Sequence, residues 1–180
     1  IAANIKIMMS PAGAEEWDGK SELTHQQLHE VEIEDLLPRE KIEVDMDAIG
    51  AMLTGRRVFI TGAAGSIGSE IVRQVASYKP AEMILVNQAE TPMHGIRLMM
   101  ARQFSDVKNE TVVASITDKD HMEKLFSEHC PEYVFHAAAF KHVPMLEDNP
   151  IQAVRNNIAG TRVIVDLALK YGTKKFVMIS

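Results

Sequence analysis

The sequence predicts an α/β domain with a doubly wound parallel sheet of about five strands over residues 47–180. Two observations carry this prediction. From Arg56 onward, short apolar runs rich in β-branched residues alternate with segments of helical periodicity. A glycine-rich turn at 61–68 follows the first run and precedes the first helical segment. Such alternation indicates parallel strands joined by helical crossovers, with helices on both faces of the sheet.

The predicted strands are apolar runs with the length of a buried strand. They comprise 57–61, 83–86, 111–115, 133–136 and 175–180. Helices are predicted between them because apolar residues recur at helical spacing, and each stripe is expected to face the sheet. The stripes are Ile67, Ile71, Val72 and Val75; Met93, Ile96, Met99 and Met100; Met122, Leu125 and Phe126; and Val154, Ile158, Val165 and Leu169.

Residues 1–46 differ in composition from the rest and are expected to be a linker. Alternating apolar residues predict a short strand over 4–9, which we interpret as the tail of a missing upstream domain. Eight acidic residues fall between positions 30 and 47. About 45 residues of this kind are too few to bury a core of their own. The domain at 47–180 is expected to be incomplete at its C-terminus.

Composition excludes several classes of protein. The 180 residues carry 19 Lys and Arg against 25 Asp and Glu, a formal net charge of −6, which argues against a nucleic-acid partner. The single cysteine, Cys130, allows no internal disulfide and is expected to be a buried apolar thiol. No apolar run reaches the roughly 18–20 residues that cross a bilayer. We expect a cytoplasmic chain without direct membrane contact and without a metal site.

The glycine-rich turn is the first indication of a ligand. Gly62, Gly65 and Gly68 have the spacing Gly-x-x-Gly-x-x-Gly, with Ser66 and Ile67 between the last two. Without Cβ atoms the turn can approach a pyrophosphate, whose charge is balanced by free N–H groups and the helix dipole. Because the turn joins a predicted strand to a predicted helix, it predicts a dinucleotide site. The turn itself contains no Gly-Lys-Ser/Thr, so it is not an NTPase P-loop.

The end of the second predicted strand bears on the choice of cofactor. It places Asn87 and Gln88 where domains of this kind bind a ribose, and Glu90 follows. An amide can hydrogen-bond a ribose hydroxyl, and no cation is present to neutralise a 2′-phosphate. The sequence therefore favours NAD over NADP. Glu90 is equally well explained as an acid in the first turn of the next helix.

The segment 136–147 begins where the fourth predicted strand ends, at the edge where ligands of such sheets collect. The small alanines at 137–139 would let a cofactor lie flat against the backbone. Lys141 and His142 are polar groups on an otherwise apolar turn, and helical or strand periodicity does not explain them. His136 itself ends a buried strand and is expected to be a structural histidine with satisfied hydrogen bonds.

Four motifs together resemble bacterial polysaccharide-biosynthesis nucleotide-sugar dehydratases, which are extended short-chain dehydrogenase/reductases acting on UDP-N-acetylhexosamines. Residues 136–144 are similar to their block His-Ala-Ala-Ala-Tyr/Phe-Lys-His-Val-Pro, and 61–70 to Thr-Gly-Ala-x-Gly-Ser-Ile-Gly-Ser-Glu. Residues 157–161 resemble Asn-x-x-Gly-Thr, and 34–39 resemble Glu-Asp-Leu-Leu-Gly-Arg with Pro38 in place of glycine. The motifs occur in the family's order.

The resemblance implies a Rossmann fold and a UDP-N-acetylglucosamine-type 4,6-dehydratase of surface or capsular polysaccharide biosynthesis. In such enzymes the nicotinamide takes a hydride from sugar C4, water leaves across C5 and C6, and the hydride returns to C6. The resemblance also implies NAD or NADP as cofactor, a UDP-sugar as substrate and a membrane-anchored parent protein. A homo-oligomer is left open. A C4 epimerase and a non-catalytic nucleotide-binding module remain alternatives.

The resemblance assigns site residues by position. The cofactor-binding set is Gly62, Gly65, Ser66, Ile67 and Gly68 at the pyrophosphate, Asn87 and Gln88 at the ribose, Ser115 and Ile116 at the adenine, Ala137, Ala138 and Ala139 beside the nicotinamide, and Lys141 and Asn157. Lys141 and His142 would also reach the substrate, and Asn157 would support the active-site backbone. Ser115 and Asn87 stand where the family commonly has acids, which predicts weak cofactor affinity.

No catalytic residue is assigned in this chain, because the family's catalytic Thr-Asp-Lys would follow Ser180. The segment 171–175 matches Tyr-x-x-x-Lys literally, but it precedes the last predicted strand, and Gly172 interrupts the helix that would align the two side chains. We interpret it as a helix end with surface lysines. The chain alone is expected to be inactive.

Overall fold

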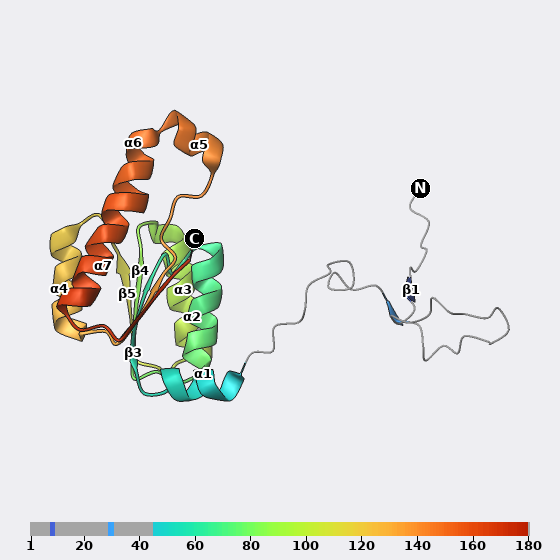
Figure 1. The fold of residues 1–180 in the computed structure, drawn as a ribbon. Coiled ribbons are helices and arrows are strands. Elements are labelled where there is room, and N and C mark those ends of the chain that lie inside the picture. Colours follow the sequence, from blue (N-terminus) through green and yellow to red (C-terminus); the bar gives the residue numbers. More distant parts are fainter. Residues whose placement is uncertain (1–7, 10–28, 31–44, 180) are drawn as a thin grey trace. The chain divides into compact units, whose positions relative to one another are not determined.

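A five-stranded parallel sheet lies at the centre of the larger unit of the chain, in the order β5-β4-β3-β6-β7 (Figure 1). The computed structural model describes residues 8–9, 29–30 and 45–179. The strands are β3 (Arg57–Thr61), β4 (Glu82–Asn87), β5 (Asn109–Val113), β6 (Tyr133–His136) and β7 (Lys175–Met178). The predicted doubly wound parallel sheet is therefore confirmed.

The path of the chain through the sheet sets the position of the ligand crevice. The chain starts in the middle at β3, moves outward to β4 and β5, and returns to the other side of β3 for β6 and β7. The strand order thus reverses between β3 and β6, and in open parallel sheets ligands bind at the carboxyl ends of the strands at such a point.

Helices connect the strands and cover both faces. They are α1 (Met46–Leu53), α2 (Ser66–Ser77), α3 (Glu90–Gln103), α4 (Lys119–His129), α5 (Val143–Asp148), α6 (Pro150–Ala153), the π-helical turn η4 (Val154–Gly160) and α7 (Thr161–Lys170). Figure 1 shows α2 and α3 on one side of the sheet and α4 and α7 on the other. Among the described residues, no helix combines the length and apolar character needed to cross a membrane.

Two hydrophobic layers result from the alternation of side chains along the strands. Val58 and Ile60 of β3 pack with α1, α2 and α3, whereas Phe59 between them packs with α4 and α7. The same alternation separates Met83 and Leu85 from Ile84 and Val86 on β4. The strands read as continuous apolar runs because helices cover both of their faces.

Before Asp45, in a unit of its own, the structure describes one pair of short strands. Within it, β1 (Met8–Met9) pairs with β2 (His29–Glu30) in antiparallel orientation. The rest of the strand predicted over 4–9 and the whole of the motif at 34–39 lie outside the described residues.

The third predicted strand is shifted in the structure. Strand β5 covers Asn109–Val113, two residues earlier than the predicted 111–115, because its pairing with β4 runs from Met83 opposite Asn109 to Asn87 opposite Val113. Ser115 therefore lies in the turn after the strand. Since β5 is at the edge of the sheet and exposes Val113, apolar residues alone do not define its ends.

The fourth predicted helical stripe is wrong. Val154, Ile158 and Leu169 are exposed by 54%, 63% and 77%, and the residues of α7 that face the sheet are instead Ile164, Leu167 and Ala168. The segment before α7 is a π-helical turn, whose i→i+5 hydrogen bonds change the residues per turn. A stripe counted with α-helical spacing therefore loses its phase across this turn. Ile67 likewise does not join the buried stripe of α2, because it is 54% exposed.

Cys130 is exposed, so the prediction of a buried apolar thiol is wrong. It is the C-terminal cap of α4, where the backbone is left-handed with φ 42° and the N–H donates to the Phe126 carbonyl. A cap position of this kind points the residue out of the helix rather than into the core. The sequence offers no glycine there that would have indicated the helix end.

A buried carboxylate, Glu82, is stabilised where the strands begin. Its carboxylate lies 2.7 Å from Lys108 Nζ and 3.3 Å from His129 Nδ1, while His129 Nε2 lies 3.3 Å from the Glu110 carboxylate. Burial alone would raise the pKa of Glu82, but the hydrogen bonds and charges of Lys108 and His129 outweigh it and lower that pKa below its ordinary value. The charged form of Glu82 therefore stabilises the fold.

We expect Glu82→Gln to lower the free energy of unfolding by roughly 1–3 kcal/mol at pH 7, because a charged acceptor is lost. Since the pKa of Glu82 is lower in the folded state, its stabilising effect is complete above the unfolded value of 4.5 and is lost as the pH falls below that value. Urea unfolding between pH 7 and pH 3 should thus show a shallower acid dependence in the variant. Glu128→Gln, which removes an exposed i,i+4 pair with Lys124, is the control and should follow the wild type. Equal acid slopes in the wild type and Glu82→Gln would contradict the prediction.

Candidate functional site

Two adjoining cavities lie at the carboxyl ends of β3, β4 and β6. The smaller, of about 110 Å³, is lined by Gly62, Gly65, Asn87, Gln88, Ala114, Ile116, Ala137, Ala138, Ala139, Phe140 and Asn156. The larger, of about 500 Å³, is lined by Gly65, Ser66, Ile67, Gly68, Ala137, Ala139, Phe140, Lys141, His142, Met145, Leu146, Asn149 and Gln152. Gly65, Ala137, Ala139 and Phe140 line both, so the two cavities adjoin at the glycine-rich turn and are together called the crevice below.

At two of its three glycines, the glycine-rich turn packs so closely against other backbone atoms that a side chain would not fit. Gly62 has φ +66°, and a Cβ there would lie 2.5 Å from the Ala137 carbonyl oxygen. A Cβ on Gly68 would lie 1.9 Å from the Gly62 carbonyl oxygen. These two glycines let β3, α2 and the loop after β6 meet closely. The turn is thereby fixed in place at the mouth of the crevice.

Gly65 has a different position from the other two glycines. It is exposed, has an ordinary φ of −74°, and is the N-terminal cap of α2. It provides no side chain to cap the helix, whereas Asp45 and Asp118 accept hydrogen bonds at the starts of α1 and α4. The first N–H groups of α2 therefore remain available to a ligand, and the helix dipole favours an anionic one.

The smaller cavity contains most of the residues expected at the adenosine end of a dinucleotide. Asn87 and Gln88 line it, although the Asn87 amide donates a hydrogen bond of 3.3 Å to the Ala89 carbonyl. Ile116 also lines it, but Ser115, expected beside it at the adenine, does not. The Ser115 hydroxyl lies 2.8 Å from Thr117 Oγ1 and accepts from the Thr117 N–H, so it serves the turn.

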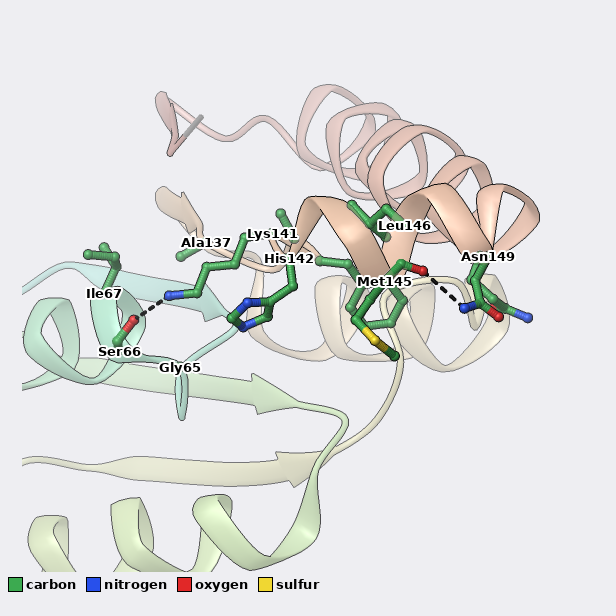
Figure 2. A pocket seen from close by; sticks show the side chains of 13 residues that line it. Gly65, Ser66, Ile67, Ala137, Lys141, His142, Met145, Leu146 and Asn149 are labelled. Carbon is green, nitrogen blue, oxygen red and sulfur yellow. Dashed lines mark hydrogen bonds between the residues drawn. The ribbon is translucent and has the colours of Figure 1, made fainter.

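Two polar side chains of the larger cavity, the cationic Lys141 and the imidazole of His142, lie across from the start of α2 (Figure 2). Lys141 Nζ donates a hydrogen bond of 3.1 Å to Ser66 Oγ and so extends over the glycine-rich turn. His142 lies next to it in Figure 2, on the same wall of the cavity. An ammonium group at the positive end of a helix is well placed to bind a phosphate group there.

The remaining wall of the larger cavity comes from α5 and α6, which the sequence did not predict. Met145 and Leu146 of α5, Gln152 of α6 and Asn149 between the two helices line it. Pro144 and Pro150 begin them within their first turns, which is a recognised indication of a helix start. That pattern could have identified both helices, although not their contribution to the cavity.

Asn157 holds the loop between β6 and α5 through two hydrogen bonds to its backbone. Its amide donates to the Phe140 carbonyl and accepts from the Phe140 N–H, both at 2.9 Å. Asn157 lies on η4, and its neighbour Asn156 is buried, lines the smaller cavity and donates to Asn157 Oδ1 at 2.9 Å. Sequence reasoning missed Asn156, which differs from Asn157 only by one position in the turn.

His136 is buried and fully hydrogen-bonded, as predicted. Its Nδ1 lies 2.7 Å from Thr61 Oγ1, and its Nε2 lies 2.8 Å from Thr161 Oγ1. Burial lowers the pKa of His136, which keeps the imidazole neutral.

The Tyr-x-x-x-Lys match at 171–175 is a helix end, as interpreted from the sequence. Tyr171 caps α7 and its hydroxyl donates to Glu123, while Gly172 has φ +70°. Lys175 begins β7 and lies 2.9 Å from Met52 Sδ. Neither side chain lines either cavity of the crevice.

A parallel sheet of this strand order, with a glycine-rich turn between its first strand and the next helix, defines a Rossmann-type nucleotide-binding domain. Residues 58–180 match the family described as "Polysaccharide biosynthesis protein". The chain belongs to this family, as the motifs at 61–70, 136–144 and 157–161 predicted.

Three relatives illustrate this membership. Probable polysaccharide biosynthesis protein EpsC of Bacillus subtilis is 41% identical over 155 residues, which are 86% of this chain and 26% of EpsC. Capsular polysaccharide biosynthesis protein CapD of Staphylococcus aureus is 41% identical over 160 residues, 88% of this chain and 27% of CapD. The UDP-N-acetylglucosamine 4,6-dehydratase (inverting) of Campylobacter jejuni is 28% identical over 130 residues, 72% of this chain and 37% of the enzyme. The chain thus spans about a quarter to just over a third of these relatives.

Solved structures of epimerases share the fold. The UDP-glucose 4-epimerase of Thermotoga maritima, solved with UDP-glucose, has a TM-score of 0.58 and 31% identity over 68% of this chain and 37% of its own. The UDP-glucose-4-epimerase of Stenotrophomonas maltophila, solved with bound NAD and formylated UDP-arabinopyranose, has a TM-score of 0.62 and 25% identity over 68% and 36%. Both of these structures were solved with a UDP-sugar.

Proposed function

We propose that residues 47–180 are the NAD-binding part of a nucleotide-sugar 4,6-dehydratase that acts on a UDP-N-acetylhexosamine in surface or capsular polysaccharide biosynthesis. Residues 1–46 are proposed to be the linker to an upstream domain. The observation that carries the proposal is the crevice along the uncapped start of α2, with Asn87 and Gln88 in one of its cavities and Lys141 and His142 in the other. The likeness to a UDP-N-acetylglucosamine 4,6-dehydratase supports the reaction class.

The residues of the crevice fit a dinucleotide. Gly65 leaves the N-terminus of α2 open to a pyrophosphate, which the N–H groups of Ser66, Ile67 and Gly68 would bind. Asn87 and Gln88 would bind the ribose in the smaller cavity, and Ala137, Ala138 and Ala139 would border the nicotinamide. When bound, the nicotinamide would supply reversible hydride transfer to the sugar.

The chain's own residues then bind and orient the sugar nucleotide. The Lys141 ammonium beside Ser66 is placed to pair with a phosphate, and His142 on the same wall can hydrogen-bond the ligand. Ile67, Met145 and Leu146 add apolar surface to the larger cavity, which a bound sugar nucleotide would cover. Asn157 holds the Phe140 backbone and with it the loop that bears Lys141 and His142.

The lining of the smaller cavity supports NAD as the cofactor. Among the described residues that line it there is no Lys or Arg, so the 2′-phosphate of NADP would have no cationic partner there. The amides of Asn87 and Gln88 can instead bind the free hydroxyls of the ribose.

A C4 epimerase is the second candidate, favoured by the structural likeness to UDP-glucose 4-epimerases. The two reactions share the first hydride transfer and differ in their later steps. With UDP-N-acetylglucosamine, the parent protein should yield a 4-keto-6-deoxy product that is lighter by one water. An epimer of unchanged mass would overturn the dehydratase assignment in favour of the epimerase.

Calorimetric titration of the 180-residue chain with NAD and then with NADP tests the proposed binding function. We expect NAD to bind and NADP to bind more weakly. Tighter binding of NADP would contradict the cofactor choice. Binding of neither nucleotide would overturn the proposal for this part of the protein.

A further inference from the structure

The carboxyl ends of β3 and β6 and the start of α7 are joined by one buried side chain, His136. Its two ring nitrogens contact the hydroxyls of Thr61 and Thr161 at 2.7 and 2.8 Å. Thr61 is the last residue of β3 and directly precedes Gly62, while Thr161 directly follows the π-helical turn η4. A single imidazole thus connects the start of the glycine-rich turn to the end of the turn that carries Asn157.

A neutral imidazole suits this position. It has one N–H donor and one acceptor nitrogen, and each threonine hydroxyl can supply the complementary role. His136 is 3% exposed and Thr61 is fully buried, so water cannot replace the Thr61 hydroxyl without opening the structure. Loss of one hydroxyl would leave a buried ring nitrogen unpaired, which is costly.

The loop at 137–142 depends on the two elements that His136 joins. The Ala137 N–H donates to the Thr61 carbonyl at 3.1 Å, and the Phe140 N–H donates to Asn157 Oδ1 at 2.9 Å. These contacts hold the loop from β3 on one side and from η4 on the other. If β3 and η4 shift relative to each other, at least one of these two hydrogen bonds must break, and Lys141 then moves away from Ser66.

We propose that His136 is a positioning residue of the dinucleotide site, which keeps the glycine-rich turn and the loop at 137–142 in place by joining Thr61 to Thr161. It lines neither cavity of the crevice and acts only through these two threonines. The expected effect of His136 on NAD affinity rests on the proposed function. Its effect on the position of the loop at 137–142 requires no ligand.

Native-state amide hydrogen exchange of Thr161→Val in the full chain tests the proposal. Valine keeps the shape of threonine and removes the hydroxyl. We expect the Ala137 and Phe140 amides to exchange about tenfold faster, while amides of the central strand β4 keep their wild-type rates. Thr161→Ser, which restores the hydroxyl, should return both rates to the wild-type values.

Thr173→Val is the matched control, because the Thr173 hydroxyl donates to the Pro131 carbonyl at 2.9 Å away from the crevice. It should leave the exchange of Ala137 and Phe140 unchanged relative to β4. Unchanged loop exchange in Thr161→Val would overturn the proposal. Equal acceleration at β4 and in the loop would also overturn it, because His136 would then serve stability alone.

Titration with NAD separates this proposal from the proposed function. If the wild type binds NAD, Thr161→Val should bind about tenfold more weakly and Thr161→Ser normally. If the wild type does not bind NAD, the proposed function fails, and the exchange pattern alone decides whether His136 positions the loop.

Discussion

The Gly68→Ala variant should melt about 10 °C below the wild-type chain, one of the two largest effects that we expect from a single substitution. The added Cβ would lie 1.9 Å from the Gly62 carbonyl oxygen and 2.7 Å from its carbonyl carbon. Both atoms belong to the backbone, so no side chain can rotate away. Either α2 must move off the sheet or the turn must open, and overpacking of this kind costs about 3 kcal/mol.

Thermal unfolding followed by circular dichroism measures this effect. Gly95→Ala is the control, because a Cβ at Gly95 in the middle of α3 meets nothing within 4 Å. That change should raise the melting temperature slightly, since alanine favours helix over glycine by about 1 kcal/mol. A Gly68→Ala melting temperature within roughly 2–3 °C of the wild type would refute the close approach of α2 to the turn, since about 3 kcal/mol should lower it much further.

The Gly65→Val variant should lose dinucleotide binding without losing its fold. Gly65 has an ordinary φ of −74°, and a Cβ would meet only the Gly62 carbonyl oxygen, at 3.2 Å. The valine side chain would instead project into the crevice, because Gly65 lines both cavities. It would keep a pyrophosphate from the N–H groups of α2, and each lost hydrogen bond to a charged group costs about 1.5–3 kcal/mol. We therefore expect an affinity loss of roughly 10- to 100-fold or more.

Calorimetric titration with NAD, paired with a thermal melt, checks both parts of this prediction. Gly65→Ala is the graded control and should weaken binding less than valine does. The melting temperatures of both variants should stay within a few degrees of the wild type, in contrast to Gly68→Ala. Unchanged affinity in Gly65→Val would place the dinucleotide site elsewhere on the domain.

Sequence patterns were sufficient for the sheet because burial on both faces leaves strands of continuous apolar residues. The runs at 57–61 and 133–136 match β3 and β6 residue for residue. The glycine spacing also predicted a turn between β3 and α2. It did not distinguish the roles of its glycines. All three line the crevice, but only the packed backbone shows that a Cβ would collide with main-chain atoms at Gly62 and Gly68 and would fit more easily at Gly65.

Other features depend on geometry that spacing does not encode. The π-helical turn at Val154–Gly160 changes which side of the following helix faces the sheet, so a stripe drawn through Val154 and Leu169 was placed on the wrong face. The end of β5 follows its pairing with β4, and Ser115, in the turn after β5, does not line the smaller cavity. Asn156 lies in the π-helical turn, is buried and lines that cavity, and none of this can be read from its spacing in the sequence.

The division of the core by the sheet has a consequence for how a ligand would act on the whole domain. The glycine-rich turn adjoins the layer of α2, whereas Asn156 and Asn157 precede α7 in the opposite layer. A dinucleotide held by both would add a further link between two layers that the strands, the contacts of His136 and the Lys141–Ser66 hydrogen bond already connect. At a concentration of about 100 times its dissociation constant it would add about 2.7 kcal/mol to the free energy of unfolding. Both layers would gain this stability, so local unfolding of either layer by itself would become less frequent in the bound domain.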